Sequence, residues 1–235
     1  MLLEICANSF KSAQNAEKAG ADRIELCSEL SVGGITPSYG LIKKVNKELS
    51  IPIHILIRPR SGDFTYTIEE FDIIKENVQL CKELGVSGIV IGVLHKDNTI
   101  DYDKTQQLIE LAKPMHVAFH RAFDCVPNPK ESLKKLVELG IETILTSGQH
   151  PKAANGIELL KELQNAAGDK LTILAGGGVN PNNVREFKKA GLKAVHASAS
   201  IVTQENKEDS YFGKTPQTVS DIETIKQLIK SIQNA

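Results

Sequence analysis

The chain has 235 residues, 41% of them hydrophobic, so it is long enough to bury a sizeable core. Its 28 basic and 29 acidic side chains leave a net charge of −1, which argues against a nucleic-acid-binding surface or a polybasic membrane-binding surface. No apolar run approaches the roughly 20 residues that a membrane-spanning helix needs. The 4 cysteines show no CxxC spacing and do not suggest a disulfide framework, so we expect the protein in the cytoplasm.

Short β-branched runs alternate with amphipathic segments along the whole chain. The predicted strands are Leu2–Cys6, Arg23–Cys27, Ile53–Arg58, Gly88–Gly92, Met115–His120, Thr143–Thr146, Leu171–Ala175 and Lys193–His196. The clearest helix is Ile68–Leu84, whose apolar residues recur at helical spacing, and a last helix is predicted over about Val219–Ile232. The helices before the second, fourth, sixth and eighth strands each end at a glycine, which stops a helix readily: Gly20, Gly85, Gly140 and Gly191.

Eight uninterrupted strand–helix units predict an α/β fold, a single (β/α)8 TIM barrel that spans residues 1–235 as one domain. The alternative is an open doubly wound sheet. That fold would need a glycine-rich turn after the first strand, where the chain instead has Cys6-Ala7-Asn8-Ser9.

The alternation of side chains along each strand predicts which residues point into the barrel. The inward set is polar for a barrel interior and consists of Glu4, Cys6, Glu25, Cys27, His54, Leu56, Arg58, His116, Ala118, His120, Leu145, Ser147, His196 and Ser198. Many of these residues lie near the carboxyl ends of their strands, where TIM-barrel enzymes carry their active sites. The sequence therefore predicts a functional site at that end.

Acid–base chemistry is the first interpretation of this set, with Glu4, Glu25, His120, Asp124 and His196 as catalytic candidates. His120 and Asp124 are close enough in sequence to form a His–Asp pair. In the structural alternative, the two glutamates and Arg58 neutralise one another. His120 then bonds a neighbouring strand, and Asp124 caps the helix that begins near Pro129.

Several loop residues at the same end suit an anionic ligand. Arg58 and Arg60 follow the third strand as two closely spaced cations. Gly176, Gly177, Ser147 and Ser198 lie after strands six to eight, where many barrels bind phosphate on backbone N–H groups. A solvated turn is the alternative for each of these loops.

Cys6 and Cys27 end adjacent parallel strands on the inward face. Two thiolates in such a pair suit the soft ion Cu(I), whereas small buried side chains would serve packing alone. Cys81 lies on the apolar stripe of its helix and is predicted to belong to the core.

These motifs together resemble the CutC family, which is named for copper homeostasis. The matching segments are Leu3-Glu4-Ile5-Cys6, Ala21-Asp22-Arg23-Ile24-Glu25-Leu26-Cys27, Gly33-Gly34-Ile35-Thr36-Pro37-Ser38, Ile57-Arg58-Pro59-Arg60, Phe119-His120-Arg121-Ala122-Phe123-Asp124, Leu145-Thr146-Ser147-Gly148-Gln149 and His196-Ala197-Ser198-Ala199. The resemblance covers about residues 1–200 and implies a TIM barrel, a cytosolic location and a role in copper handling.

Two functional hypotheses follow. The first is a cytosolic Cu(I)-binding protein with Cys6 and Cys27 as metal ligands. The second is an enzyme that acts by acid–base chemistry on a small anionic, phosphorylated or carboxylated metabolite. Under both hypotheses the expected partner is a metal ion or a small molecule, not nucleic acid or a membrane. The sequence also allows a homo-oligomer.

Overall fold

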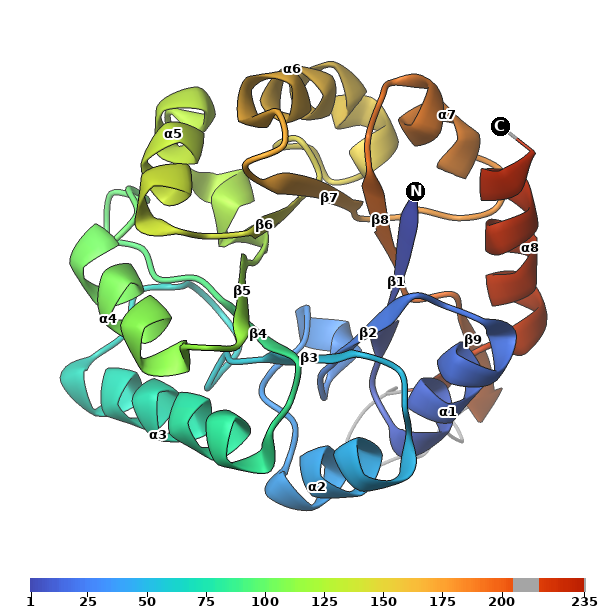
Figure 1. Ribbon diagram of the computed structural model, residues 1–235, viewed down its shortest axis with the longest axis horizontal. Helices are drawn as coiled ribbons and strands as arrows, with labels where there is room; N and C mark the ends of the chain where they lie inside the picture. Colours follow the sequence, from blue (N-terminus) through green and yellow to red (C-terminus); the bar gives the residue numbers. More distant parts are fainter. Residues whose placement is uncertain (205–215, 235) are drawn as a thin grey trace.

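The structure is a computed structural model that describes residues 1–204 and 216–234. Within those residues eight parallel strands close into a barrel, each strand hydrogen-bonded to the next and β8 to β1 (Figure 1). The strands are β1 (Leu2–Ala7), β2 (Arg23–Leu26), β3 (Ile53–Leu56), β4 (Gly88–Ile91), β5 (His116–Phe119), β6 (Thr143–Thr146), β7 (Thr172–Gly176) and β8 (Ala194–Ala197).

Helices surround the barrel as an outer ring, and the last of them packs against the first and the seventh (Figure 1). The α-helices are α1 (Phe10–Ala19), α2 (Tyr39–Glu48), α3 (Ile68–Leu84), α4 (Tyr102–Ala112), α5 (Pro129–Leu139), α6 (Ile157–Ala167), α7 (Val184–Lys189) and α8 (Ile222–Gln233). Short 3-10 turns occur at η1 (Leu30–Val32), η2 (Arg121–Cys125) and η3 (Ala153–Gly156). The predicted (β/α)8 barrel is confirmed.

Local sequence signals set several helix boundaries. Thr67 and Glu70 form a capping box at the start of α3, which explains why the predicted bounds of that helix match the structure. The Ser38 side chain accepts a hydrogen bond from the Leu41 N–H and caps α2.

The predicted start of the last helix at Val219 is wrong. Val219 belongs to β10 (Gln217–Ser220), which pairs antiparallel with β9 (Ser200–Gln204) in a hairpin that the sequence interpretation missed. The helix begins only after Asp221, whose carboxylate accepts hydrogen bonds from the Thr224 N–H and hydroxyl. A strong N-cap therefore fixes the boundary.

The two faces of the barrel strands have different surroundings. Outward residues such as Leu3, Ile5 and Ile24 pack into one large apolar core between the strands and the helices. On the inside, Cys6 and Cys27 form a separate small cluster with Leu56, Val90 and Ala118. The predicted alternation of these strands is thus confirmed.

Nearer the amino ends of the strands than this cluster lies a polar layer of Glu4, Arg23, His54 and His116, here called the lower polar layer. The His54 and His116 rings stack with centroids 4.7 Å apart. Gly88 makes room for them, because a Cβ there would lie 2.6 Å from the His54 ring. The layer closes the barrel beneath the site.

Among the described residues, no helix has the length and apolar character required to cross a bilayer.

Candidate functional site

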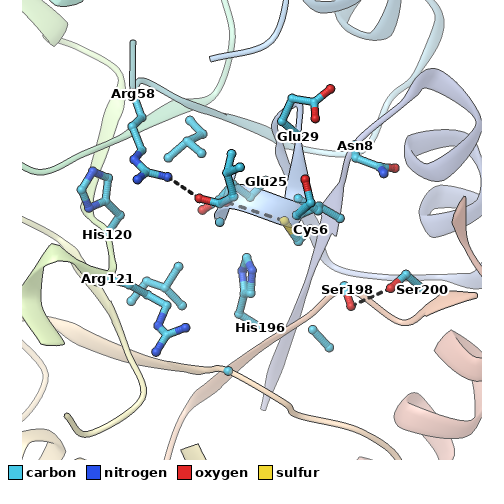
Figure 2. A pocket seen from close by; sticks show the side chains of 18 of the residues that line it. Cys6, Asn8, Glu25, Glu29, Arg58, His120, Arg121, His196, Ser198 and Ser200 are labelled. Atoms are coloured by element: carbon cyan, nitrogen blue, oxygen red, sulfur yellow. Dashed lines mark hydrogen bonds between the residues drawn. The ribbon is translucent and has the colours of Figure 1, made fainter. Parts of the chain in front are cut away.

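A cavity of about 1140 Å³ opens at the carboxyl ends of the strands (Figure 2). The predicted residues that line it from β1, β2 and the end of β8 are Cys6, Glu25, His196 and Ser198. Those from the loops after β3, β5 and β7 are Arg58, His120, Asp124 and Gly177. Glu4, Cys27, Arg60, Ser147 and Gly176 are not among the lining residues.

The floor of the cavity carries the two predicted thiols. The Sγ atoms of Cys6 and Cys27 lie 3.6 Å apart, and the Cys6 thiol lies 3.8 Å from Oε1 of Glu25. Cys27 is completely buried, so only Cys6 borders the cavity. The hydrogen bond with Cys27, burial and the nearby Glu25 and Glu4 carboxylates raise the pKa of Cys6 well above its usual value. The Cys6 sulfur is therefore held as a thiol unless a cation replaces its proton.

Glu25 is a buried carboxyl group with an unfilled hydrogen-bonding position. Its Oε2 atom has no partner among the described residues, although the side chain is almost fully buried. Burial raises the pKa of Glu25 to about 7, and the negative charge of Glu4 adds to the increase against the opposing effect of His196. This carboxyl group can gain or lose a proton near neutral pH.

His196 is held in place from below by Glu4. Its Nδ1 lies 2.8 Å from Oε1 of Glu4, and Arg23 donates to Oε2 of the same carboxylate at 2.6 Å. Burial disfavours the imidazolium, but the bond to Glu4 and the charges of Glu25 and Glu4 raise the pKa of His196. Because Nδ1 is engaged, Nε2 is the nitrogen left for a ligand, and the ring points toward Cys6 and Glu25 (Figure 2).

Cys6, Glu25 and His196 can each offer one ligand atom, and these three atoms lie within 4.8 Å of one another. A histidine whose second nitrogen bonds a carboxylate is a common arrangement at metal sites, since the carboxylate fixes the ring orientation and the tautomer. We call Cys6, Cys27, Glu25 and His196 the thiol cluster. Its donor set can hold a metal ion.

The predicted His120–Asp124 pair does not form. The His120 Nδ1 accepts a hydrogen bond from the Ala122 N–H at 3.1 Å, and its Nε2 is buried without a partner in the described part of the chain. Burial and the positive charge of Arg58 lower the pKa of His120 to about 3. His120 is therefore a neutral imidazole whose Nε2–H is an unused donor at the cavity wall.

Asp124 instead organises the loop after β6. Its carboxylate accepts hydrogen bonds from Thr146 Oγ1, the Ser147 N–H and hydroxyl, and the Gln149 N–H. It also pairs with Nε of Arg121 at 2.8 Å. Asp124 does not cap the helix near Pro129 either, because Asn128 occupies that position.

The two predicted anion-binding arginines are both engaged elsewhere. The Arg58 guanidinium donates to the carbonyls of Val32, Gly34 and Gly62, and it lies over the Phe64 ring. It pairs with neither Glu4 nor Glu25. Arg58 thus ties together the loops after β2 and β3.

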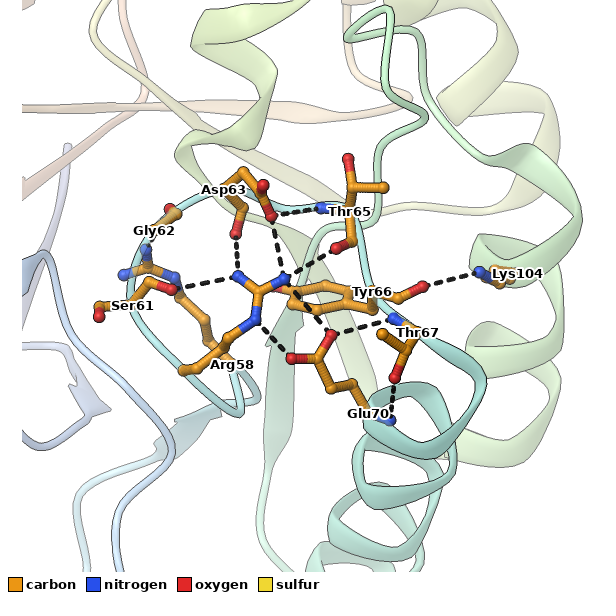
Figure 3. A network of polar contacts seen from close by, with 10 residues as sticks. Arg58, Ser61, Gly62, Asp63, Thr65, Tyr66, Thr67, Glu70 and Lys104 are labelled. Atoms are coloured by element: carbon orange, nitrogen blue, oxygen red, sulfur yellow. Dashed lines mark hydrogen bonds and ion pairs between the residues drawn. The ribbon is translucent and has the colours of Figure 1, made fainter.

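Arg60 lies outside the cavity, and its guanidinium bonds Asp63, Thr65 and Glu70. Figure 3 labels these three partners. Its guanidinium lies over the Tyr66 ring, with Cζ 5.4 Å from the centroid. These contacts hold the start of α3 against the preceding loop.

The remaining predicted residues have packing roles or lie at the rim. A Cβ at Gly176 would come within 2.5 Å of the Leu145 side chain and 3.2 Å of the His196 Cβ, so glycine there allows His196 to pack. The Ser198 hydroxyl lies 3.1 Å from that of Ser200 at the cavity rim.

Arg121 also lines the cavity but was not a predicted site residue. Strand alternation places it opposite His120 and hence outside the barrel. The chain leaves β5 at Phe119 and enters the 3-10 turn η2, so the alternation no longer applies. Arg23 was also missed as a site-supporting residue, although it shares the inward face of β2 with Glu25.

The fold and the site together define a class: a (β/α)8 barrel with a titratable, thiol-containing pocket at the carboxyl ends of its strands. The CutC family matches residues 1–201, and the chain belongs to this family. The CutC family protein of Salmonella agona is 46% identical over 201 residues, which are 86% of this chain and 81% of that protein.

Solved structures agree with this assignment. CutC of Streptococcus agalactiae, whose name refers to copper homeostasis, superposes with a TM-score of 0.81 at 35% identity, over 84% of this chain and 98% of that one. Thiamine phosphate pyrophosphorylase of Pyrococcus furiosus gives a TM-score of 0.63 at 16% identity, over 99% of this chain and 96% of that one. The second likeness shows a shared fold alone.

Proposed function

We propose that this CutC family protein binds Cu(I) at the thiol cluster, with Cys6 and Cys27 as the primary ligands and His196 beside them. The observation that carries the proposal is the 3.6 Å separation of the two sulfurs on the cavity floor. Thiolate and imidazole are ligands that a soft monovalent copper ion prefers. The donor set therefore fits the ion that the family name suggests.

The surroundings of the thiols support an exchange of protons for metal. A cation that binds both sulfurs must displace their protons, so its affinity depends on pH. The Cys6 thiol already lies against Oε1 of Glu25, which can accept the released proton. Glu4 keeps the ring of His196 turned toward the sulfurs.

Competitive titration with a Cu(I) chelator under reducing conditions tests this proposal. Cys6→Ser/Cys27→Ser should lower Cu(I) affinity by roughly 100-fold or more, because a hydroxyl is a poor ligand for a soft ion. The matched control is Cys125→Ser, which removes an exposed thiol from the cavity rim and should leave the affinity unchanged. Unchanged binding in the double variant would refute the assignment.

A second function is favoured by a different observation. The Oε2 atom of Glu25 has no partner within residues 1–204 and 216–234, and it lies at the floor of a cavity far larger than one ion. We propose, as the alternative, that the protein is an enzyme that moves a proton on a small anionic metabolite. Glu25 would transfer the proton, His196 would assist it, and the Nε2–H of His120 would bond a substrate oxygen.

Glu25→Gln separates the two functions. The variant should still bind Cu(I) through the sulfurs. If a screen of metabolites in deuterated water finds a substrate whose hydrogen the wild type exchanges with solvent, the variant should not catalyse that exchange. Glu29→Gln, at an exposed lining position, is the control and should retain the exchange. Full exchange activity in Glu25→Gln would eliminate the acid–base role.

A further inference from the structure

The cavity contains more room than the thiol cluster uses. Its volume of about 1140 Å³ slightly exceeds the range of about 300–1,000 Å³ that is typical for sites that enclose a small organic molecule. Cys6, Glu25 and His196 occupy the floor, while Arg58, His120 and Arg121 lie together on one side and Asn8, Ser198 and Ser200 lie on the other (Figure 2). The wall with the two arginines can accept a negatively charged group.

Of these two arginines, Arg121 has the exposed spare donor. The Arg58 Nε also has no partner in the described part of the chain, but it is buried. Arg58 is buried and gives its Nη1 and Nη2 atoms to three loop carbonyls. Arg121 has a side chain 43% exposed, and it donates from Nε to Asp124 and from Nη2 to Ser147. Its Nη1 makes no hydrogen bond within the described residues.

The position of the Arg121 guanidinium is fixed before any ligand arrives. Asp124 and Ser147, which hold it, bond each other at 2.9 Å, and Asp124 accepts further bonds from Thr146 and Gln149. A guanidinium held on one edge loses little further conformational entropy when its other edge binds an oxyanion. The Arg121 guanidinium is therefore both positively charged and already positioned to bind an oxyanion.

The loop after β7 keeps the space next to Nη1 open. Gly177 has φ +114°, and a Cβ there would lie 3.6 Å from Nη1 and Cζ of Arg121 and 3.3 Å from the Ser147 Cβ. Gly178 and Val179 also line the cavity, and their backbone N–H groups donate to no acceptor in the part of the chain that the structure describes. A cation and two unused amide donors thus border the same space.

We propose that Arg121, with the Gly177–Val179 loop, forms an oxyanion subsite for the phosphate or carboxylate group of a small metabolite. The subsite adds a substrate class to the proposed enzyme function. Only the chemistry after binding rests on that proposed function; anion binding itself does not. A ligand anchored there extends over the floor toward His196 and Glu25 and can reach the hydroxyls of Ser198 and Ser200 on the far wall. The substrate class is then a small polar molecule with one terminal oxyanion.

Calorimetric titration of the whole protein with inorganic phosphate, glycerol phosphate and glycerate tests the subsite. Arg121→Met should weaken the binding of the preferred anion at least tenfold. Arg185→Met, which removes one exposed cation from α7 outside the cavity, should leave the affinity unchanged. A preference for the phosphate compounds or for glycerate identifies the oxyanion.

Arg121→Gln is the second variant, because its side chain can still bond Asp124 and keep the loop folded. Anion affinity equal to that of the wild type in a folded Arg121→Gln protein would overturn the proposal, as would a wild type that binds none of the three anions. Cu(I) affinity of the same variants should stay unchanged, so loss of the subsite and loss of the copper site are distinguished. Anion binding with no hydrogen exchange would keep the subsite and reject the enzyme function alone.

Discussion

Two inward glutamates on neighbouring strands, Glu4 and Glu25, are buried to nearly the same extent but have opposite electrostatic surroundings. Glu4 lies in the lower polar layer, where burial alone would raise its pKa. The bond to His196 and the charge of Arg23 outweigh that effect and lower the pKa to about 2. Glu25 has no arginine partner, and its pKa rises to about 7. The comparison shows that a buried carboxylate with fixed cations supports structure. A buried carboxyl group such as Glu25, whose Oε2 has no partner among the described residues, is available for chemistry at the cavity.

Removing the cation of the lower layer should have the largest effect. Arg23→Met leaves the Glu4 carboxylate buried without its arginine, so we expect a loss of about 3–5 kcal/mol in the free energy of unfolding at pH 7. Chemical denaturation measures the loss, and Arg23→Lys, which keeps the charge, should lose less. A loss below about 1 kcal/mol would show that His196 alone neutralises Glu4.

The next largest effect should be a pH dependence of stability that comes from the raised pKa of Glu25. Its pKa in the folded protein lies above the ordinary value of 4.5, so the folded state holds this proton more tightly than the unfolded state does. The resulting stability is complete below about pH 4.5 and is lost as the pH rises through about 7.

Glu25→Gln removes this contribution. The difference in unfolding free energy between the variant and the wild type should shift in favour of the variant by on the order of 1–3 kcal/mol from pH 5 to pH 8. Denaturation at both pH values measures the change. Parallel pH profiles for the two proteins would contradict the raised pKa.

Two glycine substitutions compare the rigidity of the lower polar layer with that of the cavity wall. An alanine Cβ at Gly88 would lie 2.6 Å from the His54 ring, and one at Gly92 would lie 2.3 Å from the His120 ring. His54 is confined by its stacking on His116, whereas His120 borders the cavity and can rotate into it. Gly88→Ala should therefore destabilise the fold by about 1–3 kcal/mol, and Gly92→Ala by less.

Thermal unfolding of both variants tests this order. Gly92→Ala should in addition weaken the binding of any ligand that fills the cavity, because the displaced His120 ring occupies part of it. Equal stability losses in the two variants would mean that the cavity wall is as rigid as the lower layer.

The smallest effect is expected at Arg60. Its guanidinium pairs with Glu70 and Asp63 at a side chain that is 36% exposed, where solvent screens the ion pairs. Arg60→Met should reduce the unfolding free energy by only about 0.5–1 kcal/mol and leave ligand binding in the cavity unchanged. Loss of anion binding in this variant would show that Arg60 takes part in the site after all.

The sequence by itself determined the barrel and most of the inward set. Glycine ends, helix caps and the alternation within strands are local signals, and they place Glu4, Cys6, Glu25 and His196 correctly. The two sulfurs could be expected to meet because β1 and β2 are adjacent parallel strands. The sequence also showed that Arg23 shares an inward face with Glu25, although not which carboxylate it would neutralise.

The tertiary structure alone decided what happens beyond the strand ends. Arg58 donates to carbonyls of the loop after β2, and Arg60 pairs with Asp63 of its own loop and with Glu70 of α3. His120 bonds its own turn instead of Asp124, and Arg121 lines the cavity. Alternation predicts side-chain direction only within a strand, and these residues lie beyond the last residues of β3 and β5. Val32, which Arg58 contacts, and Ser147, which Arg121 contacts, lie on other loops 26 residues away in sequence, so only the closed barrel brings these pairs together.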